Sequence, residues 1–418
     1  MTKLGIVADD FTGGLMIAGY IEGAGIACPV LFDGAELDTA EKAPVVVVAT
    51  RTRLIPADEA TRHVSELADR FDAAGFEQLA YKVCASFDST DEGNIGPVAD
   101  LLAERYGQTP LLLSAGFPRF GTTMHQGYLF YRGRLVSESI KRFDPLTPMT
   151  DPDMVRALSR QTKANVGLLP HAVLRAGAEA SRSAIDTLVA SGTRYIMMDC
   201  SDEGDADAGA ALAASTRATI GSDAHIIALA KVRAGGEGAQ RREPVVHGDG
   251  PAAVLVGSVG PVATAQLESF GQAYPVRTID LLDQRTDAAI VEEALVWAEG
   301  HIGSQPFAIT TAASAEDVER AQRAHGALQA ARKAERILAG IAKGIVDRGI
   351  RRLAVAGGET SGSIVETLGI KRVRALPESE LGTGFCVTDV PHRMSLYLKP
   401  GKLGADDILL RAIDAMRS

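Results

Sequence analysis

Cysteine is scarce in this sequence, and the few cysteines are far apart. The 418 residues include four of them, Cys28, Cys84, Cys200 and Cys386, and none forms a Cys-x-x-Cys pair. This spacing predicts neither a disulfide framework nor a zinc site, and it is typical of a protein from a reducing compartment.

Long hydrophobic runs are also missing from the first residues. The short apolar run at residues 4–8 is followed at once by Asp9 and Asp10. Such a run is too short, and too soon charged, for a signal peptide or a membrane span. We therefore expect a cytoplasmic protein that does not act at a membrane.

Basic residues do not outnumber acidic ones, and the formal net charge is −10 at pH 7. Nucleic acids bind to basic faces, so this charge argues against nucleic acid as the main partner. A small anionic ligand needs only a local group of Arg and Lys, and the composition does not exclude it. A homodimer is compatible with the sequence, but no motif indicates one.

The length and the alternation of apolar runs with helical stretches predict two α/β domains. A chain of 418 residues is too long for one typical hydrophobic core. Short buried runs alternate with amphipathic stretches throughout, which favours a largely parallel sheet with flanking helices in each domain. Residues 233–250 are rich in glycine and charge, so we place the domains at 1–235 and 251–418, with a linker at 236–250.

Two adjacent carboxylates follow the first predicted strand, which spans residues 4–8. Asp9 and Asp10 stand at its carboxyl end, where open parallel sheets bind their ligands. There they could bind a sugar hydroxyl, hold a magnesium-bound phosphate or act as a general base. The alternative is that they cap the helix that starts near Thr12, which needs only one of the two.

Polar residues also follow the next two predicted strands. Arg51 and Arg53 come after the run at 45–49, and guanidinium groups bind a carboxylate bidentately; a solvated basic turn is the alternative. Lys82 ends the strand at 79–82. The loop beyond it has the density of short donors and acceptors that a polyhydroxylated ligand requires, although an ordinary surface loop is the alternative. These loop residues are Ser86, Asp88, Ser89, Thr90 and Asn94.

Three further apolar runs predict strands in the first domain, at residues 166–169, 195–198 and 226–229. His125 and His171 lie in the same half of the chain. Their spacing is unlike that of metal ligands, so we interpret them as ordinary polar residues.

A glycine turn dominates the second domain. An apolar run at 353–356 leads into Gly357 and Gly358, and we expect Thr360 or Ser361 to cap the helix that follows. A strand, a glycine turn and a helix start aim free backbone N–H groups at an anion, and glycine lets a phosphate approach the main chain. An ordinary turn between strand and helix is the alternative.

Two more glycine turns follow predicted strands, at residues 257–260 and 399–404. Three such turns at one edge of a sheet favour a nucleotide, whose phosphates need several backbone approaches. No Gly-x-Gly-x-x-Gly motif with a suitably placed acidic residue follows a strand, so an oxidoreductase that binds a dinucleotide is the least favoured interpretation.

Together these motifs resemble those of the four-carbon acid sugar kinases, and within that family the 3-oxo-tetronate 4-kinases. The resemblance runs from end to end of the chain. The matching stretches are Ile6-Val-Ala-Asp-Asp-Phe-Thr-Gly13, Tyr81-Lys82, Phe87-Asp-Ser-Thr90, Gly93-Asn-Ile-Gly-Pro97, Gln126-Gly-Tyr-Leu129, Pro145-Leu-Thr-Pro-Met-Thr150, Gly357-Gly-Glu-Thr-Ser-Gly362 and the turn from Lys399 to Gly404.

The resemblance implies an N-terminal acid-sugar-binding domain and a C-terminal ATP-binding domain. It implies transfer of a phosphoryl group from ATP, with Mg²⁺ carried by the nucleotide, to the terminal C4 hydroxyl of a four-carbon acid such as 3-oxo-tetronate. Threonate or erythronate is the alternative substrate, and a non-catalytic sensor of sugar acid and nucleotide is the alternative function. The chain departs from the family at Thr122, where an Arg is usual, and Arg119 lies nearby.

The resemblance also assigns roles to single residues. Asp10 is expected to be catalytic, orienting or deprotonating the attacking hydroxyl. The expected substrate-binding residues are Asp9, Arg51, Arg53, Lys82, Ser86, Asp88 and Ser89. The expected ATP-binding residues are Ser258, Gly357, Gly358, Glu359, Thr360, Ser361, Gly401 and Gly404.

Overall fold

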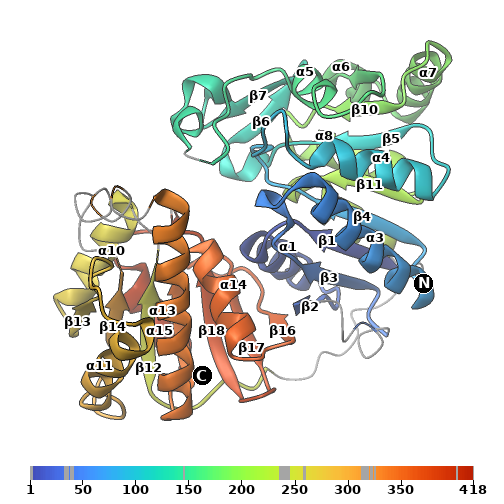
Figure 1. Cartoon of the computed structure of the whole chain (residues 1–418). Coiled ribbons are helices and arrows are strands. Elements are labelled where there is room, and N and C mark those ends of the chain that lie inside the picture. The colour runs from blue at the N-terminus through green and yellow to red at the C-terminus, as the bar shows by residue number, and fades with distance from the viewer. Residues whose placement is uncertain are drawn as a thin grey trace. The chain divides into compact units, whose positions relative to one another are not determined.

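The computed structural model describes residues 3–32, 37, 42–144, 146–234, 245–257, 260–311, 320, 323, 326–401 and 403–417. It divides into two compact units (Figure 1). The first comprises Met1–Ile17 and Ala24–Gln240, and the second comprises Ala18–Gly23 and Arg241–Ser418. Each unit is a sheet flanked by helices, and parallel strand pairs predominate, which confirms the predicted fold class.

Parallel strand pairs form the whole main sheet of the first unit, in the order β2-β3-β1-β4-β11-β5-β10-β9. The strands are β1 Leu4–Ala8, β2 Pro29–Phe32, β3 Val45–Ala49, β4 Gln78–Lys82, β5 Leu111–Ser114, β9 Val166–Leu169, β10 Tyr195–Met198 and β11 Ala218–Gly221. The helices are α1 Phe11–Gly23, α3 Ala57–Ala73, α4 Ile95–Arg105, α5 Met154–Ser159, α6 His171–Arg175, α7 Ala178–Ala190, α8 Glu203–Ala213 and α9 Asp223–Ala234.

The central strands of this sheet are apolar on both faces, as parallel strands covered by helices require. Strand β3 is Val-Val-Val-Val-Ala, and all five residues are buried. Helices α3 and α4 pack on one face of the sheet, where Val64, Phe71 and Leu102 join the core around Val7. Right-handed crossovers place α1 and α8 on the other face.

A small antiparallel sheet, which the sequence patterns did not predict, extends the first unit. It consists of β6 Thr122–His125, β7 Tyr128–Tyr131 and β8 Arg134–Leu135. Short 3₁₀ turns border it: η2 Pro118–Phe120, η3 Val136–Glu138 and η4 Ile140–Phe143. Strands of two to four residues give too little periodicity for detection by pattern.

The second unit has a mixed sheet in the order β13-β14-β12-β15-β18-β17-β16, in which only the pairs of β17 are antiparallel. Its strands are β12 Ala252–Val256, β13 Val276–Thr278, β14 Phe307–Thr310, β15 Arg352–Ala356, β16 Arg372–Ala375, β17 Phe385–Thr388 and β18 Met394–Lys399. Its helices are α10 Pro261–Gly271, α11 Asp287–Glu299, α13 Ala327–Asp347, α14 Gly358–Thr367 and α15 Ile408–Ala415.

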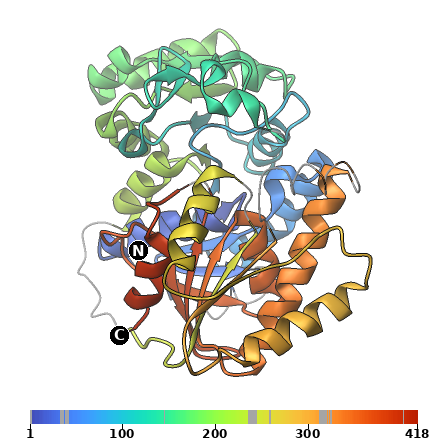
Figure 2. The same cartoon turned by 90° about the vertical axis from the view of Figure 1, so that its left-hand side faces the viewer.

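Two helical layers cover the sheet of the second unit. Helices α10 and α15 enclose one core, to which Phe270, Tyr397 and Ile413 belong. Helix α13 packs against α11 and α14, and α11 and α13 lie side by side in both cartoon views (Figures 1 and 2).

Two expectations about local structure were wrong. The run Ile226–Leu229 lies inside helix α9, and the strand is the preceding segment 218–221. Helix α9 is buried along most of its length, so it lacks the polar face that distinguishes a helix from a buried strand. Helix α14 begins at Gly358, with Gly357 as its N-cap, and neither Thr360 nor Ser361 caps it.

In both sheets, the direction in which successive strands are added reverses at a comparable point. In the first unit the strands that follow β1 are added on one side and those that follow β4 on the other, so the reversal lies between β1 and β4. In the second unit the same reasoning places it between β12 and β15. Ligands of open α/β sheets bind beyond the carboxyl ends of the strands at such a point.

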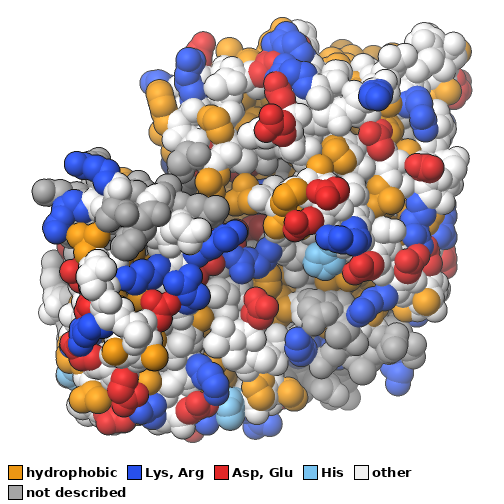
Figure 3. All heavy atoms as spheres, in the orientation of Figure 1, with side chains coloured by type: hydrophobic (Ala, Val, Ile, Leu, Met, Phe, Trp, Pro, Cys, Tyr) orange, Lys and Arg blue, Asp and Glu red, His pale blue; other side chains and the backbone are white. Residues whose placement is uncertain are grey.

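The surface carries charges of both signs. Lys and Arg side chains are interspersed with Asp and Glu on the face that Figure 3 shows. Among the described residues, no helix has the length and apolar character needed to cross a membrane.

Candidate functional site

The two carboxylates after β1 are both held by one arginine. Arg53 donates from Nε to Asp9 Oδ2 at 2.8 Å, and from Nη2 to Asp9 Oδ1 and Asp10 Oδ1 at 2.7 Å each. Arg53 lies within the 3₁₀ turn η1 Thr52–Leu54, just beyond β3. The strand ends therefore bring Arg53 to a pair of carboxylates more than forty positions away in the sequence.

Asp10 also caps helix α1, which is the alternative that the sequence offered for one of the two carboxylates. Its Oδ2 accepts from Thr12 Oγ1 at 2.8 Å and from the Gly13 N–H at 3.2 Å. Its Oδ1 faces Arg53 and is partly exposed, whereas the Asp9 carboxylate is almost fully buried. Asp10 is thus the carboxylate of the pair that a ligand can reach.

Lys82 ends β4 beside this pair and has a partner that the sequence did not reveal. Its Nζ lies 3.3 Å from Asp223 Oδ1 and 3.8 Å from Asp10 Oδ1, and the Lys82 side chain is 2 % exposed. Asp223 begins helix α9 directly after β11, which pairs with β4. Asp223, like Asp10, is an acid at the carboxyl end of a strand, and this pattern could have identified it. It was missed because the strand at 218–221 was predicted at 226–229.

The charges of this group change one another's pKa values. Burial favours the neutral form of Asp10, but Arg53 and Lys82 hold its pKa well below the ordinary range. Burial raises the pKa of Asp9 and of Asp223 despite their cationic partners. Burial would lower the pKa of Lys82, but Asp223 and Asp10 raise it above its usual value. Asp10 and Lys82 are therefore both charged at neutral pH.

A second polar group lies in the loop after β4. Asp88 accepts from Ser86 Oγ at 2.7 Å and from Cys84 Sγ at 3.2 Å, and its carboxylate pairs with Lys141 Nζ at 2.7 Å. Lys141 comes from η4 and was not singled out from the sequence. Lys141 and Arg53 lower the pKa of Asp88 against the effect of its burial.

The other predicted substrate residues are less closely connected to these two groups. Arg51 is half-buried beside η1. Ser89 Oγ accepts from Gln161 Nε2 at 3.0 Å, so this contact fixes the loop to the segment after α5. Thr122 is buried in β6, where its backbone pairs with Phe117, and Arg119 is exposed in η2.

In the second unit, the turns after β12 and β15 lie against each other. A Cβ on Gly257 would overlap the Thr360 hydroxyl, so only glycine fits there. Gly357 has a φ of 134°, and its carbonyl accepts from the Ser361 hydroxyl at 2.7 Å. The first turn of α14 leaves backbone N–H groups at the carboxyl edge of the sheet, as an anion site requires.

The remaining predicted nucleotide residues are placed as follows. Glu359 is exposed in the first turn of α14, and Gly401 and Gly404 lie in the turn after β18. The Gly357 N–H donates to the Lys399 carbonyl at 3.0 Å, so the turns after β15 and β18 are adjacent. Ser258 lies outside the described residues.

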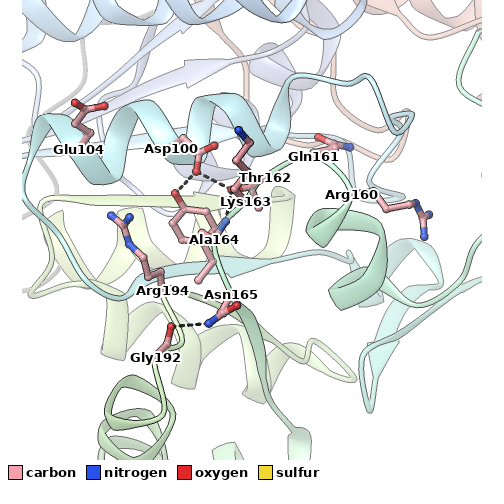
Figure 4. A pocket seen from close by; sticks show the side chains of 11 residues that line it. Asp100, Glu104, Arg160, Gln161, Thr162, Lys163, Ala164, Asn165, Gly192 and Arg194 are labelled. Carbon is pink, nitrogen blue, oxygen red and sulfur yellow. Dashed lines mark hydrogen bonds between the residues drawn. The ribbon is translucent and has the colours of Figure 1, made fainter.

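A separate hollow of about 900 Å³ lies at the opposite edge of the first sheet (Figure 4). Asn165 and Arg194, which directly precede β9 and β10, line it together with Asp100 and Lys163. Asp100 accepts hydrogen bonds from Thr162 and Tyr195 there. Since the hollow is at the amino ends of the strands, we do not assign the ligand site to it.

The carboxyl edges of the two sheets are suited to different ligands. The first has alternating carboxylates and cations, which can bind a hydroxylated anion. The second has glycine turns and a helix N-terminus, which can bind phosphate. Among the described residues, no group of three or more His, Cys, Asp and Glu side chains could hold a metal ion.

Comparison with known proteins gives the same division of the chain. Residues 4–227 match a family described as a sugar-binding N-terminal domain, and residues 253–409 match a nucleotide-binding C-terminal domain. A Methylobacterium radiotolerans protein named 3-oxo-tetronate kinase is 36% identical over 419 residues, which cover 99% of both chains. A Burkholderia multivorans protein of the same name is 35% identical, over 99% of this chain and 97% of its own.

A solved structure is similar over the whole chain as well. A Salmonella typhimurium LT2 protein, whose crystal structure was described as that of a tRNA synthase, is 30% identical. Its TM-score is 0.85, and the match covers 99% of both chains.

Proposed function

Because the chain belongs to the four-carbon acid sugar kinase family, in which its curated relatives are named 3-oxo-tetronate kinases, we propose that it transfers a phosphoryl group from ATP to the C4 hydroxyl of 3-oxo-tetronate. The observation that carries the proposal is the pair of strand-end sites, one with charged side chains around Asp10 and one with glycine turns around Gly357. Threonate and erythronate are the alternative substrates.

In this proposal the first unit binds the sugar acid. Arg51 and Arg53 bind its carboxylate; Nη1 of Arg53 is available for this, because Asp9 and Asp10 engage the other two nitrogens. Lys82, Ser86, Asp88 and Ser89 bind its oxygens, and Lys141 holds Asp88 in place. Asp9 fixes Arg53 and takes part in substrate binding through it.

Asp10 orients the attacking hydroxyl in this mechanism. Its low pKa keeps the carboxylate ionised, so it can accept a hydrogen bond from the hydroxyl, but it is a weak base for removing the proton before transfer. In phosphoryl transfer the leaving group departs early, so positioning and charge stabilisation contribute more than proton removal. The proton therefore passes to Asp10 or to the transferred phosphate late in the step.

The second unit binds ATP through Gly357 to Ser361, through Gly401 and Gly404, and through Ser258. The backbone N–H groups at the start of α14 donate to phosphate oxygens. Mg²⁺ carried by ATP would neutralise phosphate charge. The negative net charge gives no support to tRNA as a ligand of this chain.

A coupled assay of ADP release over a panel of C4 acids tests the proposal. We expect release with 3-oxo-tetronate to exceed that with threonate or erythronate. Faster release with threonate or erythronate would change the substrate and keep the kinase. Binding of acid and ATP without release, at any concentration of enzyme, would favour the sensor and overturn the proposal.

A further inference from the structure

We propose that Lys399 is the phosphate-binding cation of the nucleotide site, and that ATP binding is coupled to the uptake of a proton by its side chain. The inference rests on the proposed function for the identity of the ligand. It concerns a residue at the end of β18 that lies in a matching stretch but to which neither the resemblance nor the comparisons assign a role.

The Lys399 side chain is buried, and no described residue supplies a counter-ion to it. It is 2 % exposed, and its one hydrogen bond among the described residues runs from Nζ to Gln266 Oε1 at 3.0 Å. An ammonium has three donors, so two are unused in a dry environment. A buried charge of this kind normally has an anionic partner, because its desolvation is costly.

The place of Lys399 in the sheet indicates which anion is missing. β18 pairs with β15, and the Lys399 carbonyl accepts from the N–H of Gly357, the N-cap of α14. The lysine therefore lies at the carboxyl edge of the sheet, next to the turn that we assign to ATP phosphates. A triphosphate bound there is an anion that Lys399 could reach.

Gln266 connects the same lysine to the last glycine turn. Its Nε2 lies 3.1 Å from the carbonyls of Leu403, Gly404 and Ala405. Gln266 is fully buried in α10, so its amide fixes both the lysine and the turn. A purely structural role for Lys399 would consist of its link through Gln266 to this turn, without any contact to phosphate.

Among the described residues, the neighbouring elements supply no competing charge. Their ionisable residues include Glu268 of α10, Glu359 of α14, Asp407 before α15, Cys386 of β17 and Tyr397 of β18. None of these forms an ion pair with Lys399, and burial alone lowers the pKa of Lys399 to about 8. Burial raises the pKa of Cys386 and of Tyr397, so both stay neutral where Lys399 titrates.

Isothermal titration of MgATP into the full chain, without sugar acid, tests the proposal. Above about pH 8 a large share of the Lys399 side chains is neutral, so binding should take up a measurable fraction of a proton per site, seen as a difference in heat between two buffers of unequal ionisation enthalpy. Lys399→Met should abolish the uptake and weaken binding about 10- to 100-fold. The exposed Lys343→Met on α13 is the matched control and should change neither quantity.

Gln266→Leu separates the charge of Lys399 from its structural link to the glycine turn. This variant loses the hydrogen bonds from Gln266 to the turn at 403–405 but keeps the Lys399 amine. It should weaken ATP binding and retain proton uptake. Circular dichroism and the melting temperature show whether each variant folds. ATP binding by the wild type with equal heat in both buffers overturns this inference alone. Absence of ATP binding by the wild type overturns the proposed function as well.

Discussion

Lys82 of the first unit and Lys399 of the second are both 2 % exposed at the carboxyl edge of a sheet, but their surroundings differ. Lys82 lies near Asp223 and Asp10, which raise its pKa, whereas the only hydrogen bond of Lys399 Nζ to a described residue is with an amide, and burial lowers its pKa to about 8. The first unit thus contains the counter-ions of its buried lysine. The second lacks them, as expected where the ligand supplies the negative charge.

The two lysines lie in sheets with the same arrangement of their first strands. The order β2-β3-β1-β4 in one unit corresponds to β13-β14-β12-β15 in the other. Acidic residues follow β1, and glycines follow β12. The topology fixes where a ligand binds, and the residues after the strands determine which ligand it is.

The largest expected effect concerns the charged site. Asp10→Asn removes a negative charge that the attacking hydroxyl needs, so we expect kcat to fall by about 10²- to 10⁴-fold while ATP affinity is unchanged. Steady-state kinetics and MgATP titration measure the two quantities. Asp207→Asn, on the exposed face of α8, is the control and should retain full activity. Near-normal turnover of the Asp10 variant would remove it from the mechanism.

Replacing either lysine by methionine compares the two environments directly. Lys82→Met leaves the buried Asp223 without its cation, whereas Asp10 keeps Arg53, and should lower the free energy of unfolding by about 3–5 kcal/mol. Lys399→Met removes an unpaired charge and should cost little or stabilise the protein. Urea unfolding at pH 7 measures both. In the double variant Lys82→Met with Asp223→Asn, stability should be partly recovered; no recovery would refute the pairing.

The pH dependence of stability gives a smaller effect of opposite sign for the two lysines. Because the pKa of Lys399 is lower in the folded state, the unfolded chain binds more protons above about pH 8, and this lysine makes stability rise from there towards pH 10. The stability that Lys82 contributes is present below its unfolded pKa and is lost only above about pH 10. The free energies of unfolding of the wild type and of Lys399→Met should therefore converge as pH rises. Parallel curves would show that Lys399 keeps its proton.

The smallest expected effect concerns the glycine turns. Gly257→Ala places a Cβ against Thr360 and should raise the KM for ATP about 3- to 10-fold, with little change in the KM for the sugar acid. Gly271→Ala at the end of α10 is the control, since its Cβ would make ordinary contact with Val276. An equal rise in both KM values would indicate general damage.

The sequence patterns predicted most of the strands that position the sites. β1, β3, β9 and β10 start and end as expected, because each is an apolar run bounded by polar or turn residues. The misplacement of 226–229 shows the limit of this method. A helix that is buried all round has no polar face, so its sequence is indistinguishable from that of a buried strand.

The site could be predicted as a set of strand-end residues but not as a network of contacts. Asp223 and Lys141 are paired with residues more than fifty positions away, and no local pattern reveals such pairs. The antiparallel β6–β8 sheet escaped detection because its strands are too short for periodicity. Roles that depend on a partner's position, such as that of Gln266, need the tertiary structure.

Gly13 has no functional group, yet the charged site depends on it. A Cβ at this position would occupy the space that Asp10 Oδ1 and Lys82 Nζ fill. In a saturation library of the whole chain, position 13 should therefore tolerate substitution as poorly as the acid and the amine beside it. A ranking of positions by chemical reactivity alone would overlook it, and a screen for altered substrate preference would do well to leave it unchanged.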